Sequence, residues 1–147
     1  MTKIKDMQSG PCCPITCALE LLGDRWSLSL MRDMLLFGRR RYSELLASSG
    51  PISTNILASR LKQLQEGELI ERFKDPLDGK AAIYIPTDKG VSLIPVLVEM
   101  VRWGLQNDER ALLVPYLERE LVHDNAKLQQ RVSAQIAEER DALTSAA

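Results

Sequence analysis

The chain has 147 residues, of which 45% are hydrophobic and 27% are charged, and its net charge is −1. This composition predicts an ordinary soluble domain and excludes disordered and collagen-like chains. No run approaches the roughly 18 apolar residues that a membrane helix needs, and residues 1–10 lack the apolar stretch of a signal peptide, so we expect a cytoplasmic protein with no membrane partner.

Two helices are predicted at the start of the chain. Pro14 suits a first helical position, and Gly23 is a stop signal. Between them apolar residues recur at helical spacing, namely Ile15, Ala18, Leu19 and Leu22. Asp24 can cap a second helix that runs to Gly38. Because this second segment is apolar on all sides, we expect it to be the central core helix.

A helix-turn-helix is predicted next. A third helix covers roughly residues 42–47, and a fourth begins at Ser53 and runs to about Glu66. The Gly50-Pro51 turn separates them. Such a pair presents its second helix to the major groove of DNA.

The fourth helix carries two different faces. Its apolar side holds Ile56, Leu57, Leu61 and Leu64, and its other side holds Thr54, Asn55, Ala58, Ser59 and Lys62. Small polar side chains let a helix approach the groove floor, where Asn pairs with adenine and Ser or Thr bonds to bases or phosphates. The DNA-binding candidates here are Ser53, Thr54, Asn55, Ser59, Arg60 and Lys62. An ordinary solvated helix surface is the alternative.

Positive charge is concentrated around this predicted motif. Residues 38–62 have a local balance of +4, whereas residues 96–147 carry six Lys or Arg against nine Asp or Glu. We therefore expect Arg39, Arg40 and Arg41 to contact DNA phosphates, with a merely solvated charged face as the alternative.

A β-hairpin is predicted after the fourth helix. Residues 69–73 and 82–85 are β-prone, and Asp78-Gly79 marks the turn between them. As the wing of a winged helix, this hairpin would place Lys80 against the DNA backbone. A plain surface hairpin is the alternative.

Several short motifs, in this order and spacing, resemble the HxlR-type winged-helix transcriptional regulators of bacteria. They include Cys13-Pro14, Leu22-Gly23-Asp24-Arg25-Trp26, Arg41-Tyr42-Ser43-Glu44-Leu45, Ile52-Ser53, Lys89-Gly90 and Trp103-Gly104. The resemblance covers about two-thirds of the chain. It implies a homodimeric regulator that binds double-stranded DNA sequence-specifically, with the fourth helix as the reader.

The expected fold is therefore mainly α with a small β-hairpin: a winged helix-turn-helix with a long C-terminal dimerisation helix. We assign residues 1–12 to an N-terminal arm, 13–104 to the DNA-binding domain and 105–147 to a helical extension. In that extension apolar residues sit mostly four or seven apart, which predicts a helix of roughly 40 Å over residues 116–143. Its narrow seam favours pairing with a second copy of the chain, and folding back onto its own domain is the alternative.

Three cysteines, Cys12, Cys13 and Cys17, bracket the start of the first helix. In a cytoplasmic chain they argue against a disulfide framework and leave buried thiols, metal ligation or redox chemistry. A helix N-terminus lowers a thiol pKa, so Cys13 is the best candidate redox sensor. Cys17 is also expected to be a small buried hydrophobe. The resemblance agrees, since some HxlR-type proteins sense oxidants or electrophiles through thiols.

Neither a metal site, a cofactor nor an enzyme is expected. The cysteine spacing is not a zinc pattern, and His123, the one histidine, lies far away in the tail. Neither a phosphate-cradling glycine loop nor a serine elbow is present. Three hypotheses stay open: a DNA-binding regulator switched by an oxidant at cysteine, the same regulator switched by a small molecule bound between the helices of the dimer, and a winged-helix adaptor that binds protein.

Overall fold

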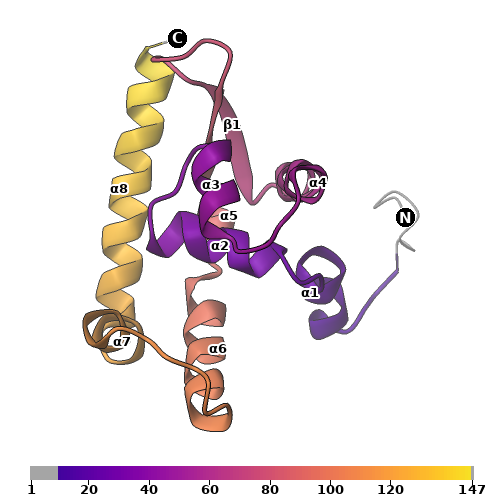
Figure 1. The fold of residues 1–147 in the computed structure, drawn as a ribbon, viewed down its shortest axis with the longest axis vertical. Helices are drawn as coiled ribbons and strands as arrows, with labels where there is room; N and C mark the ends of the chain where they lie inside the picture. Colours follow the sequence, from indigo (N-terminus) through magenta and orange to yellow (C-terminus); the bar gives the residue numbers. More distant parts are fainter. Residues whose placement is uncertain (1–9, 147) are drawn as a thin grey trace.

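The computed structural model describes residues 10–146, so most of the predicted arm (1–12) lies outside the described residues (Figure 1). The elements in chain order are α1 (Pro14–Leu22), α2 (Ser27–Leu36), α3 (Tyr42–Ser48), α4 (Thr54–Glu66), β1 (Ile70–Lys74), β2 (Ala82–Pro86), α5 (Asp88–Val91), α6 (Ile94–Asn107), α7 (Pro115–Val122) and α8 (Asn125–Ser145). The fold is mainly α with one antiparallel hairpin, as predicted.

Helix α2 forms the centre of the core and contacts α1, α3, α6 and β2. Leu30, Met31 and Met34 on this helix are fully buried. The N-cap of α2 is Trp26 and not Asp24 as predicted, but Asp24 holds the turn before the helix by accepting hydrogen bonds from the backbone N–H of Trp26 (2.8 Å) and from Ser27. Burial alone would raise the pKa of Asp24, but the bonds from Ser27 and Trp26 outweigh it and lower that pKa.

The hairpin pairs β1 with β2 in a register that runs from Ile70 opposite Pro86 to Lys74 opposite Ala82. The segment before α3 adds to its edge, because the N–H of Tyr84 donates to the carbonyl of Arg40 (2.8 Å). This bond fixes the hairpin relative to the helix-turn-helix. We call β1, β2 and the connection 75–81 the wing.

Gly90 allows close contact between α5 and the strand side of the fold. A Cβ atom at this position would collide with the backbone carbonyl of Leu69. Thr87, one residue before α5, accepts a hydrogen bond from the N–H of Gly90 (3.1 Å) and donates one to the carbonyl of Glu68 (2.6 Å). The start of α5 is therefore anchored to the turn that follows α4.

The C-terminal extension is two helices, not the single free-standing helix that the spacing predicted. Leu117 and Leu121 of α7 and Leu128, Val132 and Ile136 of α8 are all buried within the same chain. The chain bends at His123 and Asp124, so that α8 packs along α5 and β2 while α7 lies across its base (Figure 1). With this bend, the apolar residues of α7 and those of α8 can both be buried on the same domain. The expectation of a protruding seam is therefore wrong.

Within residues 10–146, no helix combines the length and the apolar character needed to cross a membrane.

Candidate nucleic-acid interface

The helix-turn-helix is formed by α3 and α4, and hydrogen bonds fix the start of each helix. Ser53 caps α4 by accepting from the N–H of Ile56 (3.2 Å). The hydroxyl of Tyr42, the first residue of α3, donates to the carbonyl of Thr54 (2.9 Å). The two helices are thus joined directly at the end of α4 that a recognition helix presents to DNA.

The outer face of α4 carries most of the predicted base-reading residues. Thr54, Asn55 and Lys62 are exposed and Ser59 is half-buried, while the opposite side is buried through Leu57, Leu61 and Leu64. Ile56, predicted on the apolar side, is instead exposed. It lies about 100° around the helix from Leu57 and falls at the edge of the buried stripe. The accessible face is therefore mainly small and polar, with Ala58 and Ile56 as its apolar side chains.

The three consecutive arginines have three different environments. Arg39 is exposed. Arg40 is buried, with 9% of its surface exposed. It donates to the carbonyl of Met34 (2.6 Å) and to the Glu139 carboxylate (2.6 Å) on α8. Because this ion pair and the backbone acceptor hold the charge of Arg40 inside the fold, we no longer expect Arg40 to contact DNA.

Arg41 links α3 to the wing. Its guanidinium donates to the buried carboxylate of Asp75 (2.8 Å). This hydrogen bond, with the accompanying charge attraction, raises the pKa of Arg41 and lowers that of Asp75. Glu44 accepts from the backbone N–H of Arg40 (2.8 Å) and Arg41 (3.1 Å), which lowers its own pKa. The Arg41 side chain is still partly exposed. It can therefore hold the wing in place through Asp75 and still be reached from solvent.

The two remaining basic candidates, Arg60 and Lys80, differ in whether their side chains are already bonded to other residues. Arg60 donates to the side-chain oxygen of Gln63 (2.5 Å) and lies 3.6 Å from the carboxylate of Asp24. It is turned toward the start of α2, so its predicted phosphate contact requires another rotamer. Lys80 is exposed in the wing, beside a turn where its N–H donates to Asp78 (3.1 Å).

Asp33 was missed by the sequence analysis. It is 1% exposed, and one carboxylate oxygen accepts from the hydroxyls of Ser48 (2.9 Å) and Ser49 (2.8 Å), at the turn between α3 and α4. The other oxygen pairs with Arg32 (2.8 Å). An aspartate in the helix that was expected to form the core was the available signal. Its role is to fix the helix-turn-helix turn to the core helix.

The cysteines lie at the start of α1, a helix with no buried residue. A disulfide joins Cys12 to Cys17, whose Cα atoms are 6.1 Å apart, and Cys13 is a free, exposed thiol. The expectation of a buried Cys17 is therefore wrong, since α1 buries none of its side chains within this chain. Hydrogen bonds from the backbone N–H of Thr16 and then Ile15 lower the pKa of Cys13, as a helix N-terminus predicts. Within residues 10–146, no group of three or more potential ligands is placed to hold a metal ion.

Comparison with known proteins agrees with this geometry. The HxlR-like helix-turn-helix family matches residues 21–111. The HTH-type transcriptional regulator YodB of Bacillus subtilis is 38% identical over 95 residues, which are 64% of this chain and 84% of YodB. The solved structure of its reduced form superposes with a TM-score of 0.56 at 36% identity, covering 67% of this chain and 97% of that one. The quinone-bound form gives a TM-score of 0.53 at 36% identity, covering 65% and 99%.

Proposed function

Because the chain belongs to the HxlR-like helix-turn-helix family and is a transcriptional regulator of that type, we propose that it binds an inverted repeat of double-stranded DNA sequence-specifically as a homodimer. The observation that carries this proposal is the exposed polar face of α4, in a chain that also exposes Arg39. Asn55 is assigned to an adenine edge, and Ser53, Thr54 and Ser59 to bases or nearby phosphates. Arg39, Lys62, Lys80 and the exposed part of Arg41 supply phosphate contacts.

Fluorescence-anisotropy titration with duplexes from the protein's own upstream region tests this assignment. Asn55→Ala should weaken specific binding by about 1–3 kcal/mol while leaving non-specific binding nearly unchanged. Gln130→Ala, an exposed polar residue on α8, is the matched control and should bind like the unmodified chain. No specific, salt-sensitive binding to any duplex would favour the protein-adaptor hypothesis instead.

The dimer is proposed to form through α1 and α6. Large apolar side chains on these two helices are exposed, including Ile15 (70%) and Leu19 on α1 and Met100 and Trp103 (68%) on α6. Exposed apolar surface of this kind marks an interaction site, and a second copy of the chain is the simplest partner. Two recognition helices spaced by one helical turn of DNA, about 34 Å, would then read an inverted repeat.

Thiol oxidation at Cys13 is the proposed switch. An exposed thiol with a lowered pKa is more reactive toward oxidants, and α1 belongs to the proposed dimer surface. The relative YodB, solved in reduced and quinone-bound forms, supports the same direction. The test is DNA binding under hydrogen peroxide, which oxidises a single thiol to a sulfenic acid and is itself reduced to water, and then under a thiol reductant: Cys13→Ser should bind DNA normally and lose the oxidant response. An unchanged response in that variant would rule out Cys13.

A further inference from the structure

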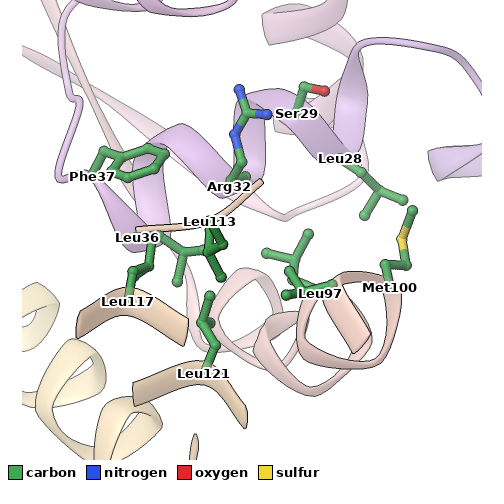
Figure 2. A pocket seen from close by; sticks show the side chains of 11 residues that line it. Leu28, Ser29, Arg32, Leu36, Phe37, Leu97, Met100, Leu113, Leu117 and Leu121 are labelled. Carbon is green, nitrogen blue, oxygen red and sulfur yellow. The ribbon is translucent and has the colours of Figure 1, made fainter. Parts of the chain in front are cut away.

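An apolar cavity lies where α2, α6 and α7 meet. Its volume is about 240 Å³, and leucines from all three helices converge on it (Figure 2). The main contributors are Leu28, Leu36, Leu97, Met100, Leu117 and Leu121. Neither the DNA-reading face nor Cys13 uses this cavity, and Met100 at its edge also belongs to the proposed dimer surface.

Its polar groups lie at the edge and carry no free charge. In Figure 2 the guanidinium of Arg32 is turned away from the leucines, and it pairs with the buried Asp33 (2.7 Å). The hydroxyl of Ser29 is also at the rim and offers a hydrogen bond. An ionised ligand would therefore lose its water without gaining a counter-charge, so the lining favours an uncharged molecule.

The volume limits the size of the ligand. A cavity of about 150 Å³ lined by apolar side chains binds benzene, whereas drug-sized sites span roughly 300–1,000 Å³. The cavity described here falls between these sizes. We propose that it binds a small uncharged aromatic compound of one or two rings, with any polar substituent directed to Ser29.

The position of the cavity connects it to DNA binding. Leu113, Leu117 and Leu121 form one wall, and they come from the part of the chain beyond the family match at residues 21–111. The opposite wall includes Arg32, whose neighbour Asp33 holds Ser48 and Ser49 in the helix-turn-helix turn. A ligand that displaces α2 would thus act on that turn. This coupling rests on the proposed function, whereas the binding itself does not.

Binding can be measured on the full chain without DNA. The probes are 1-naphthol, which is uncharged at neutral pH, and 1-naphthoate, its anionic counterpart with the same rings. With ¹³C-methyl methionine labelling, saturable 1-naphthol binding should shift the methyl signal of Met100, which lines the cavity, more than that of Met31. Met31 is buried in the core away from the cavity lining.

Two variants complete the test. Leu113→Trp fills the cavity and should weaken 1-naphthol binding at least about tenfold. Leu112→Trp changes the neighbouring residue, which is 91% exposed and does not line the cavity, and should bind normally. Thermal unfolding verifies that both variants fold. If Leu113→Trp does not fold, the Met100 shift in the unmodified chain decides whether 1-naphthol binds in the cavity.

Absence of saturable binding, or a shift of Met31 without Met100, would overturn the site. Equal affinity for 1-naphthoate would overturn the assignment to an uncharged ligand. Anisotropy titration of DNA with and without 1-naphthol is a separate measurement, so failed DNA binding would count against the proposed function and not against the cavity.

Discussion

The thiol of Cys13 faces backbone N–H groups in the first turn of α1, and these stabilise the thiolate over the thiol. Since the pKa of Cys13 is lowered from its ordinary value of 9.0, its reactivity should rise at lower pH than that of an unstructured cysteine. The alkylation rate with iodoacetamide is measured as a function of pH. We expect the native chain to reach half its maximal rate at a lower pH than the same chain unfolded in urea. Cys12→Ser with Cys17→Ser leaves Cys13 as the single thiol.

The urea sample is the internal control for this prediction, because it removes helix α1 but keeps the local sequence. Identical midpoints in the native and unfolded states would show that the helix start does not activate Cys13. The sign also fixes the stability effect: a lowered pKa in the folded state favours folding above the unfolded pKa, and this contribution is lost as pH falls through the folded pKa.

Arg39 and Arg40 are neighbours with opposite expected roles. Arg40→Ala removes a buried guanidinium from Glu139 and from the Met34 carbonyl, and should lower the free energy of unfolding by about 2–4 kcal/mol. Arg39→Ala alters an exposed side chain and should change stability by no more than about 0.5 kcal/mol. Urea unfolding measures both values.

DNA binding is expected to depend on Arg39 through a direct contact. Arg39→Ala should weaken binding to all duplexes and reduce the slope of log affinity against log salt by about 1. If Arg40→Ala were fully stable and only Arg39→Ala unfolded the chain, the assignment of the two arginines would be reversed.

At the scale of elements, Asp33 connects the core helix to the DNA-reading pair. Asp33→Asn keeps the side-chain shape but loses the charge that pairs with Arg32 and one oxygen acceptor. We expect a loss of about 1–3 kcal/mol in unfolding free energy. Specific DNA affinity should also fall, measured well below the melting temperature, because the α3–α4 turn loosens.

The matched control for Asp33 is Asp141→Asn, which removes an exposed carboxylate on α8. It should leave both stability and DNA affinity close to those of the unmodified chain. If Asp33→Asn behaved the same way, the hydroxyl bonds from Ser48 and Ser49 would have no role in holding the reading helix.

Local signals were sufficient to predict most elements of the winged helix. Pro14, Gly23 and Ser53 mark helix ends through backbone chemistry that depends only on near neighbours, and α1 and α4 begin and end close to the predicted residues. The hairpin followed from β-prone runs around Asp78-Gly79. These features need no knowledge of the rest of the fold.

Features that depend on distant partners were not predicted. Arg40 is buried because Glu139, 99 residues away, reaches it from α8, and no local pattern distinguishes Arg40 from Arg39. The bend at His123 lets the apolar residues of α7 pack against α6 while those of α8 pack against α5 and β2. Cys17 was expected to be buried on the basis of its helix face, yet no residue of α1 is buried, and it is Leu21 and Leu22 at the end of the helix that pack partly against the core. In each case tertiary packing decided the outcome.

For the molecule as a whole, the C-terminal extension packs on its own domain, whereas apolar faces elsewhere are exposed. The seam of α8 is covered by its own domain through Leu128, Val132 and Ile136, so it has little apolar surface left for a partner. Exposed large apolar residues are instead found on α1 and α6, among them Ile15, Leu19, Met100 and Trp103. A dimer built on these two helices would place the cysteine region at or beside the subunit interface, where oxidation could alter the spacing of the reading helices.

This arrangement predicts which substitution separates the subunits. Trp103→Glu places a charge on the exposed apolar face of α6 and should convert the dimer to a monomer at micromolar concentration, as measured by sedimentation equilibrium. Leu112→Glu alters a residue that is 91% exposed and lies outside α1 and α6, and should leave the dimer intact. Because a dimer on two half-sites gains about 10²–10⁴ in affinity over a single site, the Trp103→Glu monomer should bind the inverted repeat about as weakly as a single half-site. A stable dimer in Trp103→Glu, or a monomer in Leu112→Glu, would move the interface away from α6.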